Sequence, residues 1–132
     1  MRETVFDPVR RKRVVLTPEE GVRQHLINEL SSCFGYPLQL MSCEYPLKIN
    51  NIKYRGDLVV FDKSAKPILL AECKAPDIKI TAETFNQISR YNFVLGVKFL
   101  LVTNGNETLL AKIDGKDVSF LTEIPHYNDL IE

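Results

Sequence analysis

The chain has 132 residues, of which 45% are hydrophobic and 26% charged, and its 17 Lys and Arg balance 17 Asp and Glu. These values are typical of one soluble domain with a single core, so we expect one domain over residues 1–132. The zero net charge argues against nonspecific coating of nucleic acid, whose strength comes from phosphate neutralisation. No apolar run approaches the ~20 residues of a membrane helix, so we expect no membrane contact.

The three cysteines are odd in number, lack C-x-x-C spacing and follow no secretory segment. This pattern favours reduced, buried thiols in a cytoplasmic protein.

Residues 1–16 are predicted to form a basic N-terminal arm. The arm contains the run Arg10-Arg11-Lys12-Arg13, followed by the strand-like Val14-Val15-Leu16. Such a run is most often a solvated edge or tail. The alternative is a contact with a DNA backbone, for which the candidates are Arg11, Lys12 and Arg13.

A first helix is predicted over residues 18–32. Thr17 and Glu20 have the spacing of a capping box, and Pro18 occupies the first helical position. We therefore favour a capping role for Glu20. His25 lies off the apolar stripe of Val22, Leu26 and Leu30, so it is expected to be exposed.

A strand is predicted over residues 38–44, and a β-hairpin over residues 54–62 and 67–74. Two apolar runs flank the polar turn of this hairpin. Counting outward from a midpoint between Ser64 and Ala65 places Asp57 opposite Glu72. Directly opposed carboxylates repel, which suggests that they share a cation.

Strand alternation places Glu72 and Lys74 on one face of the hairpin and Cys73 on the other. Two carboxylates and an ammonium on one patch suit a divalent metal ion with a bound water, which can hydrolyse a phosphodiester. In this interpretation Asp57 and Glu72 bind the ion, the Cys73 carbonyl is a third ligand, and Lys74 positions the water. The alternative is a surface hairpin with a weakly stabilising ion pair.

The remaining elements are a helix over residues 81–95, a central strand over residues 98–103 and a second hairpin. The helix has Thr81 as N-cap and Gly96 just past its end, and it carries Gln87 and Tyr91 on one face. The strand is expected to run parallel to a neighbour through the helical crossover. The second hairpin spans residues 108–113 and 118–121, and residues 122–132 are expected to be a C-terminal tail.

The series Asp57, Glu72-Cys73-Lys74 and Gln87-Ile88-Ser89-Arg90-Tyr91 resembles the D…E-x-K…Q-x-x-x-Y motif of the PD-(D/E)XK nuclease superfamily. More narrowly, the chain is similar to the N-terminal nuclease domain of type I restriction enzyme R subunits. Thr17-Pro18-Glu19-Glu20-Gly21-Val22-Arg23-Gln24 and Leu101-Val102-Thr103-Asn104-Gly105 also look like segments of that domain. The resemblance covers roughly residues 17–105. Gly56 stands where the superfamily name has proline.

The resemblance implies an α/β (α+β-like) fold with an αβββαβ core, in which two helices flank a mixed sheet and a C-terminal β-hairpin follows. It implies a Mg²⁺-dependent endonuclease that cleaves DNA, with Mn²⁺ able to replace Mg²⁺. Asp57, Glu72 and Lys74 would be catalytic, and Gln87 and Tyr91 would support the metal, water or DNA. In related nucleases an acid on the first helix completes the metal shell, which gives Glu20 a second candidate role.

The implied partners are DNA and the motor and specificity or methyltransferase subunits of a restriction system. Cleavage of both strands would suit a homodimer. Two alternatives compete with the nuclease: a DNA-binding or assembly module of the same fold that does not cleave, and a small α/β scaffold with a solvated ion pair.

Overall fold

The computed structural model describes residues 2–131, and the side chains of Tyr91, Phe93 and Val94 lie outside that description. The helical segments are α1 (Pro18–Phe34), the 3₁₀ turn η1 (Leu38–Leu40), α2 (Ala82–Leu95) and α3 (Tyr127–Leu130). The strands are β1 (Thr4–Asp7), β2 (Lys12–Val15), β3 (Met41–Ile49), β4 (Ile52–Phe61), β5 (Pro67–Cys73), β6 (Phe99–Thr103), β7 (Thr108–Asp114) and β8 (Asp117–Leu121).

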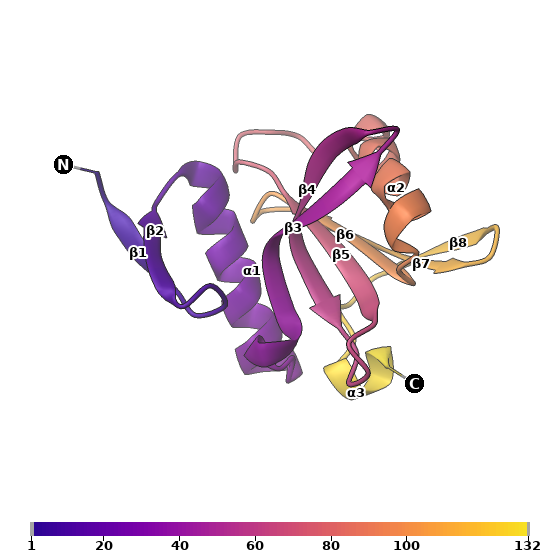
Figure 1. The fold of residues 1–132 in the computed structure, drawn as a ribbon, viewed down its shortest axis with the longest axis horizontal. Helices are drawn as coiled ribbons and strands as arrows, with labels where there is room; N and C mark the ends of the chain where they lie inside the picture. The colour runs from indigo at the N-terminus through magenta and orange to yellow at the C-terminus, as the bar shows by residue number, and fades with distance from the viewer. Residues whose placement is uncertain (1, 132) are drawn as a thin grey trace.

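Six strands form one mixed sheet in the order β3-β4-β5-β6-β7-β8, with α1 on one side and α2 on the other (Figure 1). Each face of the sheet has its own apolar core. Leu58 and Leu69 pack with α1, whereas Val59 and Leu70 pack with α2. The alternation along β4 and β5 therefore builds a three-layer arrangement from strands that are apolar on both faces.

The element order α1-β3-β4-β5-α2-β6 confirms the predicted αβββαβ core with a mixed sheet between two helices. Strands β5 and β6 are parallel, as expected for a crossover through α2. All five residues of β6 are buried, as suits a central strand. The predicted C-terminal hairpin forms from β7 and β8.

Both long helices begin after the predicted N-caps and α2 ends before Gly96 as predicted, whereas α1 runs two residues past its predicted end at residue 32. The Thr17 side chain accepts a hydrogen bond from the Glu20 amide, and Thr81 and Thr84 form a reciprocal capping box. Gly35 and Gly96 end the helices in the left-handed region, at φ 72° and 66°, which costs glycine little. These stops fix the points at which the chain enters β3 and β6.

Three further predicted boundaries were wrong. The first core strand begins at Met41 and runs to Ile49, because residues 38–40 form the turn η1. Residues 122–132 are more than a tail: α3 buries Tyr127, whose hydroxyl donates to the Phe61 carbonyl at 2.8 Å. The basic arm is a β-hairpin, since β1 and β2 pair from Thr4↔Val15 to Asp7↔Lys12.

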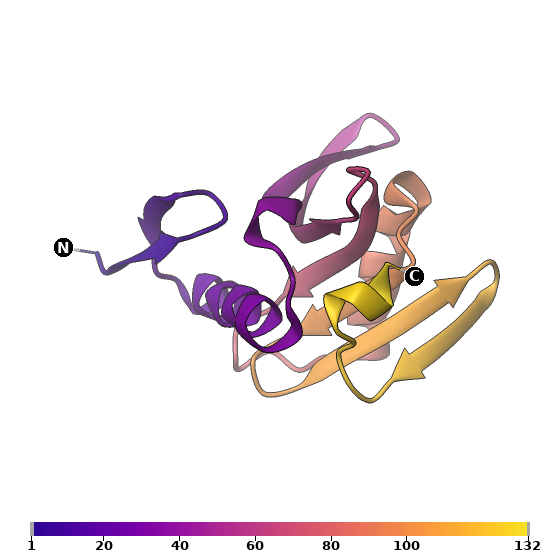
Figure 2. The same ribbon diagram turned by 90° about the horizontal axis from the view of Figure 1, so that it is seen from below.

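The N-terminal hairpin lies beside α1, away from the six-stranded sheet (Figure 2). Its tip is fixed by Asp7, which is fully buried and accepts hydrogen bonds from the Val9 amide and the Arg10 guanidinium. Val9 at the same tip packs against the core beneath α1, so polar and apolar contacts together hold the hairpin.

Strands β3 and β4 extend beyond β5 as a two-stranded ribbon, because β4 pairs with β5 only from Leu58 to Phe61. The ribbon changes direction at Glu44, where φ is 54° and the ladder skips the pair of Glu44 and Asp57. Before this point Cys43 packs with the α1 core, and after it Tyr45 packs with the α2 core. The bend places Asp57 at the base of the ribbon.

Within residues 2–131, no helix is both long enough and apolar enough to cross a bilayer.

The cysteines are free, as predicted, but their burial differs: Cys73 is buried, Cys43 is partly buried and Cys33 is exposed. The expectation of buried thiols was therefore wrong for Cys33. His25 is exposed, as expected from its position off the apolar stripe.

Candidate functional site

Asp57 and Glu72 lie at the end of the β4–β5 ladder. Leu58 pairs with Ala71, in the register that would place Asp57 beside Glu72 at the next step. The ladder ends there, and the Asp57 carboxylate accepts a hydrogen bond of 2.8 Å from the Cys73 amide. A side chain thus replaces the missing backbone partner of a buried strand end.

The two faces of β5 separate the polar residues of the site from Cys73. Cys73 is 2% exposed and packs in the core beneath α1. Glu72 is half-buried on the opposite face of β5, as the alternation predicted, and Lys74, also half-buried, directly follows the strand. The amide of Lys74 donates to the Thr103 carbonyl at 2.9 Å, so β6 holds the end of β5 in place.

Burial and mutual repulsion disfavour ionisation of both acids. Burial, the Asp57 charge and a hydrogen bond between the two carboxyls raise the pKa of Glu72 to about 8. Burial also raises the pKa of Asp57, against the opposing effects of the Cys73 amide and Arg23. The two carboxyls therefore share a proton at neutral pH, as closely spaced carboxylate pairs do.

One oxygen of this pair has no partner. Glu72 Oε2 is fully buried and makes no hydrogen bond among the described residues. A buried polar atom left without a partner costs free energy, so it calls for an explanation. The nearby Lys74 ammonium lowers the pKa of both Asp57 and Glu72, which shows that its charge acts on the pair.

Glu19 is an acidic neighbour that the sequence analysis did not single out. Its charge raises the pKa of both Asp57 and Glu72. Both Glu19 and Glu20 line the same pocket as Asp57, but the Glu20 carboxylate is bonded to Arg10 and Arg23. The acid of the first helix that faces the Asp57–Glu72 pair is therefore Glu19.

Glu20 is buried between two arginines. Its carboxylate accepts hydrogen bonds from Arg10 at 2.6 Å, from Arg23 at 2.8 and 2.9 Å and from Gln24 at 3.2 Å. Burial raises the pKa of Glu20, but the arginine bonds outweigh it and lower the pKa to about 2. The Glu20 amide bonds to the Thr17 side chain, but the predicted capping role of the Glu20 carboxylate was wrong, because that carboxylate joins the N-terminal hairpin to α1.

Arg23 links this cluster to the acid pair. The guanidinium is 11% exposed, and besides its bonds to Glu20 it donates to the Asp57 carbonyl at 3.2 Å. The Glu20 charge and hydrogen bonds raise the pKa of Arg23 despite its burial. Arg23 therefore fixes the backbone of Asp57 relative to α1.

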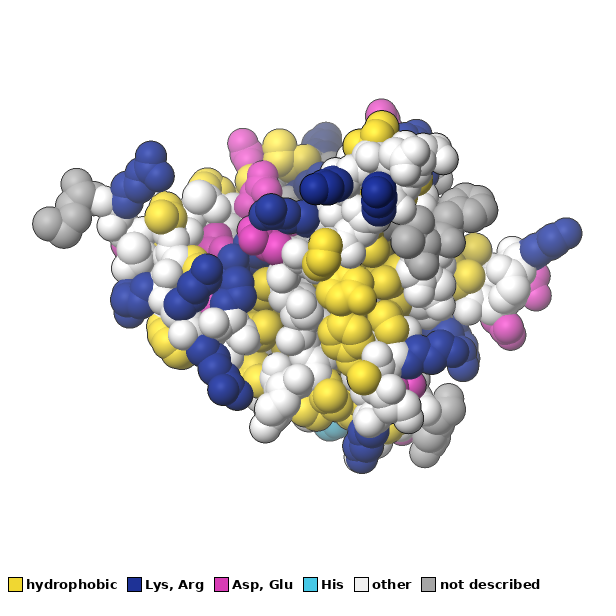
Figure 3. Space-filling view, viewed as in Figure 1, with side chains coloured by type: hydrophobic (Ala, Val, Ile, Leu, Met, Phe, Trp, Pro, Cys, Tyr) yellow, Lys and Arg dark blue, Asp and Glu magenta, His cyan; other side chains and the backbone are white. Residues whose placement is uncertain are grey.

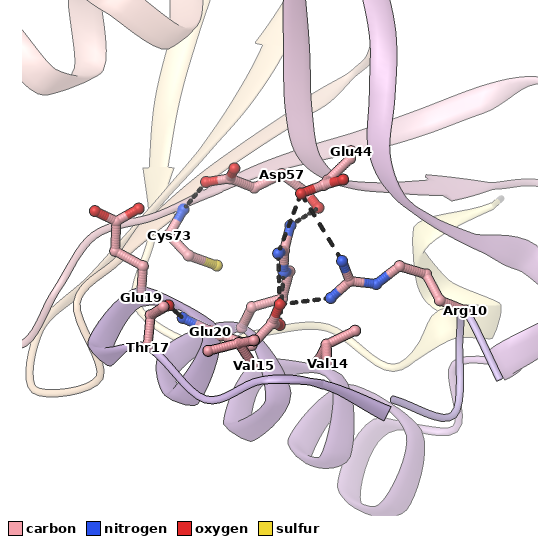
Figure 4. A pocket seen from close by; sticks show the side chains of 10 residues that line it. Arg10, Val14, Val15, Thr17, Glu19, Glu20, Glu44, Asp57 and Cys73 are labelled. Carbon is pink, nitrogen blue, oxygen red and sulfur yellow. Dashed lines mark hydrogen bonds and ion pairs between the residues drawn. The ribbon is translucent and has the colours of Figure 1, made fainter. Parts of the chain in front are cut away.

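A pocket of about 370 Å³ lies between the N-terminal hairpin, the start of α1 and the end of β5 (Figure 4). Asp57 points toward Cys73 at one end of this pocket, and Arg10 reaches toward Glu20 and Glu44 at the other. The pocket thus has an acidic end at Asp57 and Glu19 and an end where arginines gather.

The residues of the Q-x-x-x-Y series lie on α2. Gln87 is exposed, and among the described residues no hydrogen bond joins it to Asp57, Glu72 or Lys74. The side chain of Tyr91 falls outside the described part of the chain. Roles for Gln87 and Tyr91 at the site remain predictions.

The three basic residues considered for DNA contact, Arg11, Lys12 and Arg13, are exposed on the N-terminal hairpin. Arg13 bonds to the Thr4 side chain and carbonyl. Arg10, the first residue of the run, instead lies half-buried against Asp7 and Glu20. The run is therefore divided between a structural arginine and three exposed charges.

Among the side chains of residues 2–131 that the structure describes, no three His, Cys, Asp or Glu lie close enough together to hold a metal ion. The candidate site thus consists of the Asp57 and Glu72 carboxylates and the Lys74 ammonium. Cys73 lies between Glu72 and Lys74 in the sequence.

Comparison with solved structures shows a similar fold. A fragment assigned as the HsdR subunit of a type I restriction enzyme from Vibrio vulnificus YJ016 superimposes with a TM-score of 0.69 and 19% sequence identity. The match covers 88% of this chain and 25% of that one, so the chain spans about a quarter of its structural relative. No curated protein matches the chain.

The family described as type I restriction enzyme R protein N terminus matches residues 18–125. This range runs from the start of α1 almost to α3 and includes the acid pair, Lys74 and all of the six-stranded sheet. By this match over most of its length, the chain belongs to the type I restriction enzyme R protein N-terminal family.

Proposed function

We propose that this domain is a Mg²⁺-dependent DNA endonuclease whose metal ligands are Asp57 and Glu72. The observation that carries the proposal is the buried carboxyl pair at the end of the β4–β5 ladder, with Glu72 Oε2 left without a partner. Membership of a restriction-enzyme family supports DNA as the substrate.

The residues present fit a divalent cation. Magnesium prefers oxygen ligands and commonly uses one or two carboxylates, with water and substrate phosphate completing its shell. Asp57 and Glu72 supply the carboxylates, and the Cys73 carbonyl is the proposed third protein ligand. A bound cation would satisfy the orphaned Glu72 oxygen and allow both acids to ionise.

Each residue of the site then has a defined task. A bound divalent ion supplies Lewis acidity and lowers the pKa of water. Lys74 directly follows β5, and its charge acts on Glu72, so we propose that its ammonium orients the attacking water or stabilises charge that develops on phosphorus. Arg23 holds the Asp57 backbone at 3.2 Å, which keeps one ligand in place against α1.

The roles that the family resemblance implies for Gln87 and Tyr91, as supports for the metal, water or DNA, belong to this proposal. So do a homodimer and partners that supply motor and specificity or methyltransferase functions. The whole protein of the structural relative is about four times as long as the matched region, which leaves room for such functions.

The first test is a calorimetric titration with Mg²⁺ and with Mn²⁺, in the presence and absence of a short DNA duplex. We expect the wild type to bind metal and Glu72→Gln to lose that binding. Asp114→Asn is a matched control, since Asp114 and Asp117 also face each other on paired strands but are exposed. Equal metal binding by Glu72→Gln and the wild type would refute the site.

The second test is cleavage of duplex DNA with Mg²⁺ or Mn²⁺. Asp57→Ala and Lys74→Ala should each abolish cleavage while the protein remains folded by circular dichroism. Cleavage retained in both variants would overturn the assignment. DNA binding that is indifferent to metal, together with no metal binding in the wild type, would favour a non-cleaving module of the same fold.

A further inference from the structure

Glu44 stands at the centre of three arginines from three parts of the chain. Its Oε1 lies 3.8 Å from Arg10 in the N-terminal hairpin and 3.8 Å from Arg23 in α1. Its Oε2 lies 3.6 Å from Arg55 in β4. The sequence analysis treated none of these residues as a site, because they come together only through the fold.

The contacts to Glu44 are long compared with the other ion pairs of the cluster. Arg10 and Arg23 approach Glu20 to 2.6 and 2.8 Å, whereas no arginine comes closer than 3.6 Å to Glu44. Charge-assisted hydrogen bonds between nitrogen and carboxylate are normally 2.7–2.9 Å long. Glu44 therefore balances the arginines by charge without being held by them.

Burial shows which acid of the cluster can be replaced. Three positive charges face three negative ones: Arg10, Arg23 and Arg55 against Asp7, Glu20 and Glu44. The side chains of Asp7 and Glu20 are 0% and 6% exposed, while that of Glu44 is 44% exposed. Removing Asp7 or Glu20 would leave buried arginine charges without a partner. The partly exposed Glu44 carboxylate can move away at a low cost in free energy.

The backbone at Glu44 also favours an exchange. Glu44 sits at the bend of the β3–β4 ribbon with a positive φ of 54°, outside the pairing ladder. Its side chain, Arg10 and Arg23 border the same pocket as Asp57 (Figure 4), and Arg55 lies outside it on the exposed side of Glu44. An anion that entered beside Arg10 and Arg23 would lie in the pocket that also contains the proposed metal ligand.

We propose that Arg10, Arg23 and Arg55 form a binding site for a backbone phosphate of DNA, and that Glu44 occupies this site when DNA is absent. The inference rests on the proposed function for its substrate. A phosphate is an anion that guanidinium groups bind well, and it would restore the charge balance when the Glu44 carboxylate moves away. Glu44 thereby acts as an internal competitor of the substrate.

The surface around the site suits this occupant. Lys48 and Lys53 are directly paired across the ribbon, and both are exposed. Directly opposed like charges destabilise a strand pair, and a bound polyanion would relieve that repulsion. Figure 3 shows Lys and Arg side chains over the part of this face where β3 and β4 lie.

The test measures the affinity of the protein for a fluorescent DNA duplex by anisotropy, in EDTA and at several salt concentrations. Glu44→Gln should bind the duplex about fivefold more tightly than the wild type, because the competing carboxylate has been neutralised. Its salt dependence should also steepen by about 0.9 in log–log slope for each added phosphate contact.

Two further variants make the result specific. Glu123→Gln removes the same charge at an exposed position that borders a different pocket. Glu44→Gln/Arg55→Gln should lose the gain in affinity, since Arg55 is the exposed arginine of the site. Equal effects of Glu44→Gln and Glu123→Gln, or no DNA binding by any variant, would overturn the inference. Because EDTA removes the metal, this outcome is independent of the calorimetric test of Asp57 and Glu72.

Discussion

The carboxylate of Asp57 accepts a hydrogen bond of 2.8 Å from the backbone amide of Cys73, at the point where β4 leaves β5. This bond has two effects. It satisfies a buried strand end, and it turns the Asp57 side chain toward the strand that carries Glu72. The local geometry that ends the ladder is therefore the same geometry that brings the two acids together.

Glu72→Gln is predicted to stabilise the metal-free protein in a pH-dependent way. The pKa of Glu72 is about 8 in the folded chain and 4.5 without the shift, so folding takes up protons between these values. The stability of the wild type should therefore fall as pH rises from about 4.5 to 8. We expect a loss on the order of 2 kcal/mol, which is less than the full pKa shift of Glu72 would give because Asp57 shares the proton. Thermal unfolding in EDTA measures this.

At pH 4 the Glu72→Gln variant and the wild type should unfold at the same temperature. At pH 8.5 the variant should unfold roughly 4–8 °C higher. Saturating Mg²⁺ should raise the unfolding temperature of the wild type and leave that of the variant unchanged. An unfolding temperature of the variant below that of the wild type at high pH would contradict the electrostatic account of the pair.

Glu20→Gln is predicted to destabilise the protein by about 3–5 kcal/mol at pH 7, because it leaves Arg10 and Arg23 buried without their carboxylate. The pKa of Glu20 is lowered from 4.5 to about 2, so its contribution is present above pH 4.5 and is lost as pH falls toward 2. Urea unfolding at pH 7 and pH 3 should show a smaller difference at pH 3.

Glu29→Gln is the control for Glu20→Gln on the same helix. The Glu29 side chain is 40% exposed and lies 3.8 Å from His25, so its loss should change stability by less than about 1 kcal/mol. Comparable losses in the two variants would mean that the arginine cluster contributes no more than a surface pair.

Gly56→Ala is predicted to cost about 1–3 kcal/mol, because a Cβ at this position would lie 2.8 Å from Cδ1 of the fully buried Leu70. Gly21→Ala, in α1, is the contrasting variant: its Cβ would meet only Leu16 Cδ1 at 3.8 Å. That change should be neutral or stabilising by up to about 1 kcal/mol. Equal stability of the two variants in urea would show that Leu70 repacks freely.

Strand alternation and turn residues were sufficient to predict the acid pair. The apolar runs around Asp57 and Glu72 fix which side chains share a face, and the count from the turn gave the register of Leu58 and Ala71. The packing around β4 gives a reason for glycine at position 56. Leu70 from the paired strand fills the space that a side chain would need.

The sequence analysis weighed only Glu20 as the acid of the first helix that approaches the Asp57–Glu72 pair, although Glu19 is also acidic and points about 100° away from it around the helix. A signal was present, however: Glu20 lies three, seven and ten residues before Arg23, Ile27 and Leu30, which are all buried. That spacing places Glu20 on the packed face of α1.

The arginine cluster was beyond prediction for a different reason. It depends on a left-handed residue at Glu44, a conformation that non-glycine residues seldom adopt and that no local pattern indicates. The bend that follows also moves Tyr45 to the opposite core from Cys43, so simple alternation fails across it.

Asp57 and Glu72 lie close together in the sequence, so we expect their repulsion to affect the rate of folding. Asp57 and Glu72 are brought together by a single hairpin, whereas Arg23 and β6 must arrive from distant parts of the chain. Contacts between residues close in sequence form fast, so we expect repulsion between the acids to slow the closing of this hairpin during folding. We expect Mg²⁺ to accelerate refolding in stopped-flow experiments as well as to slow unfolding. A cation that changed only the unfolding rate would show that the hairpin closes after the transition state.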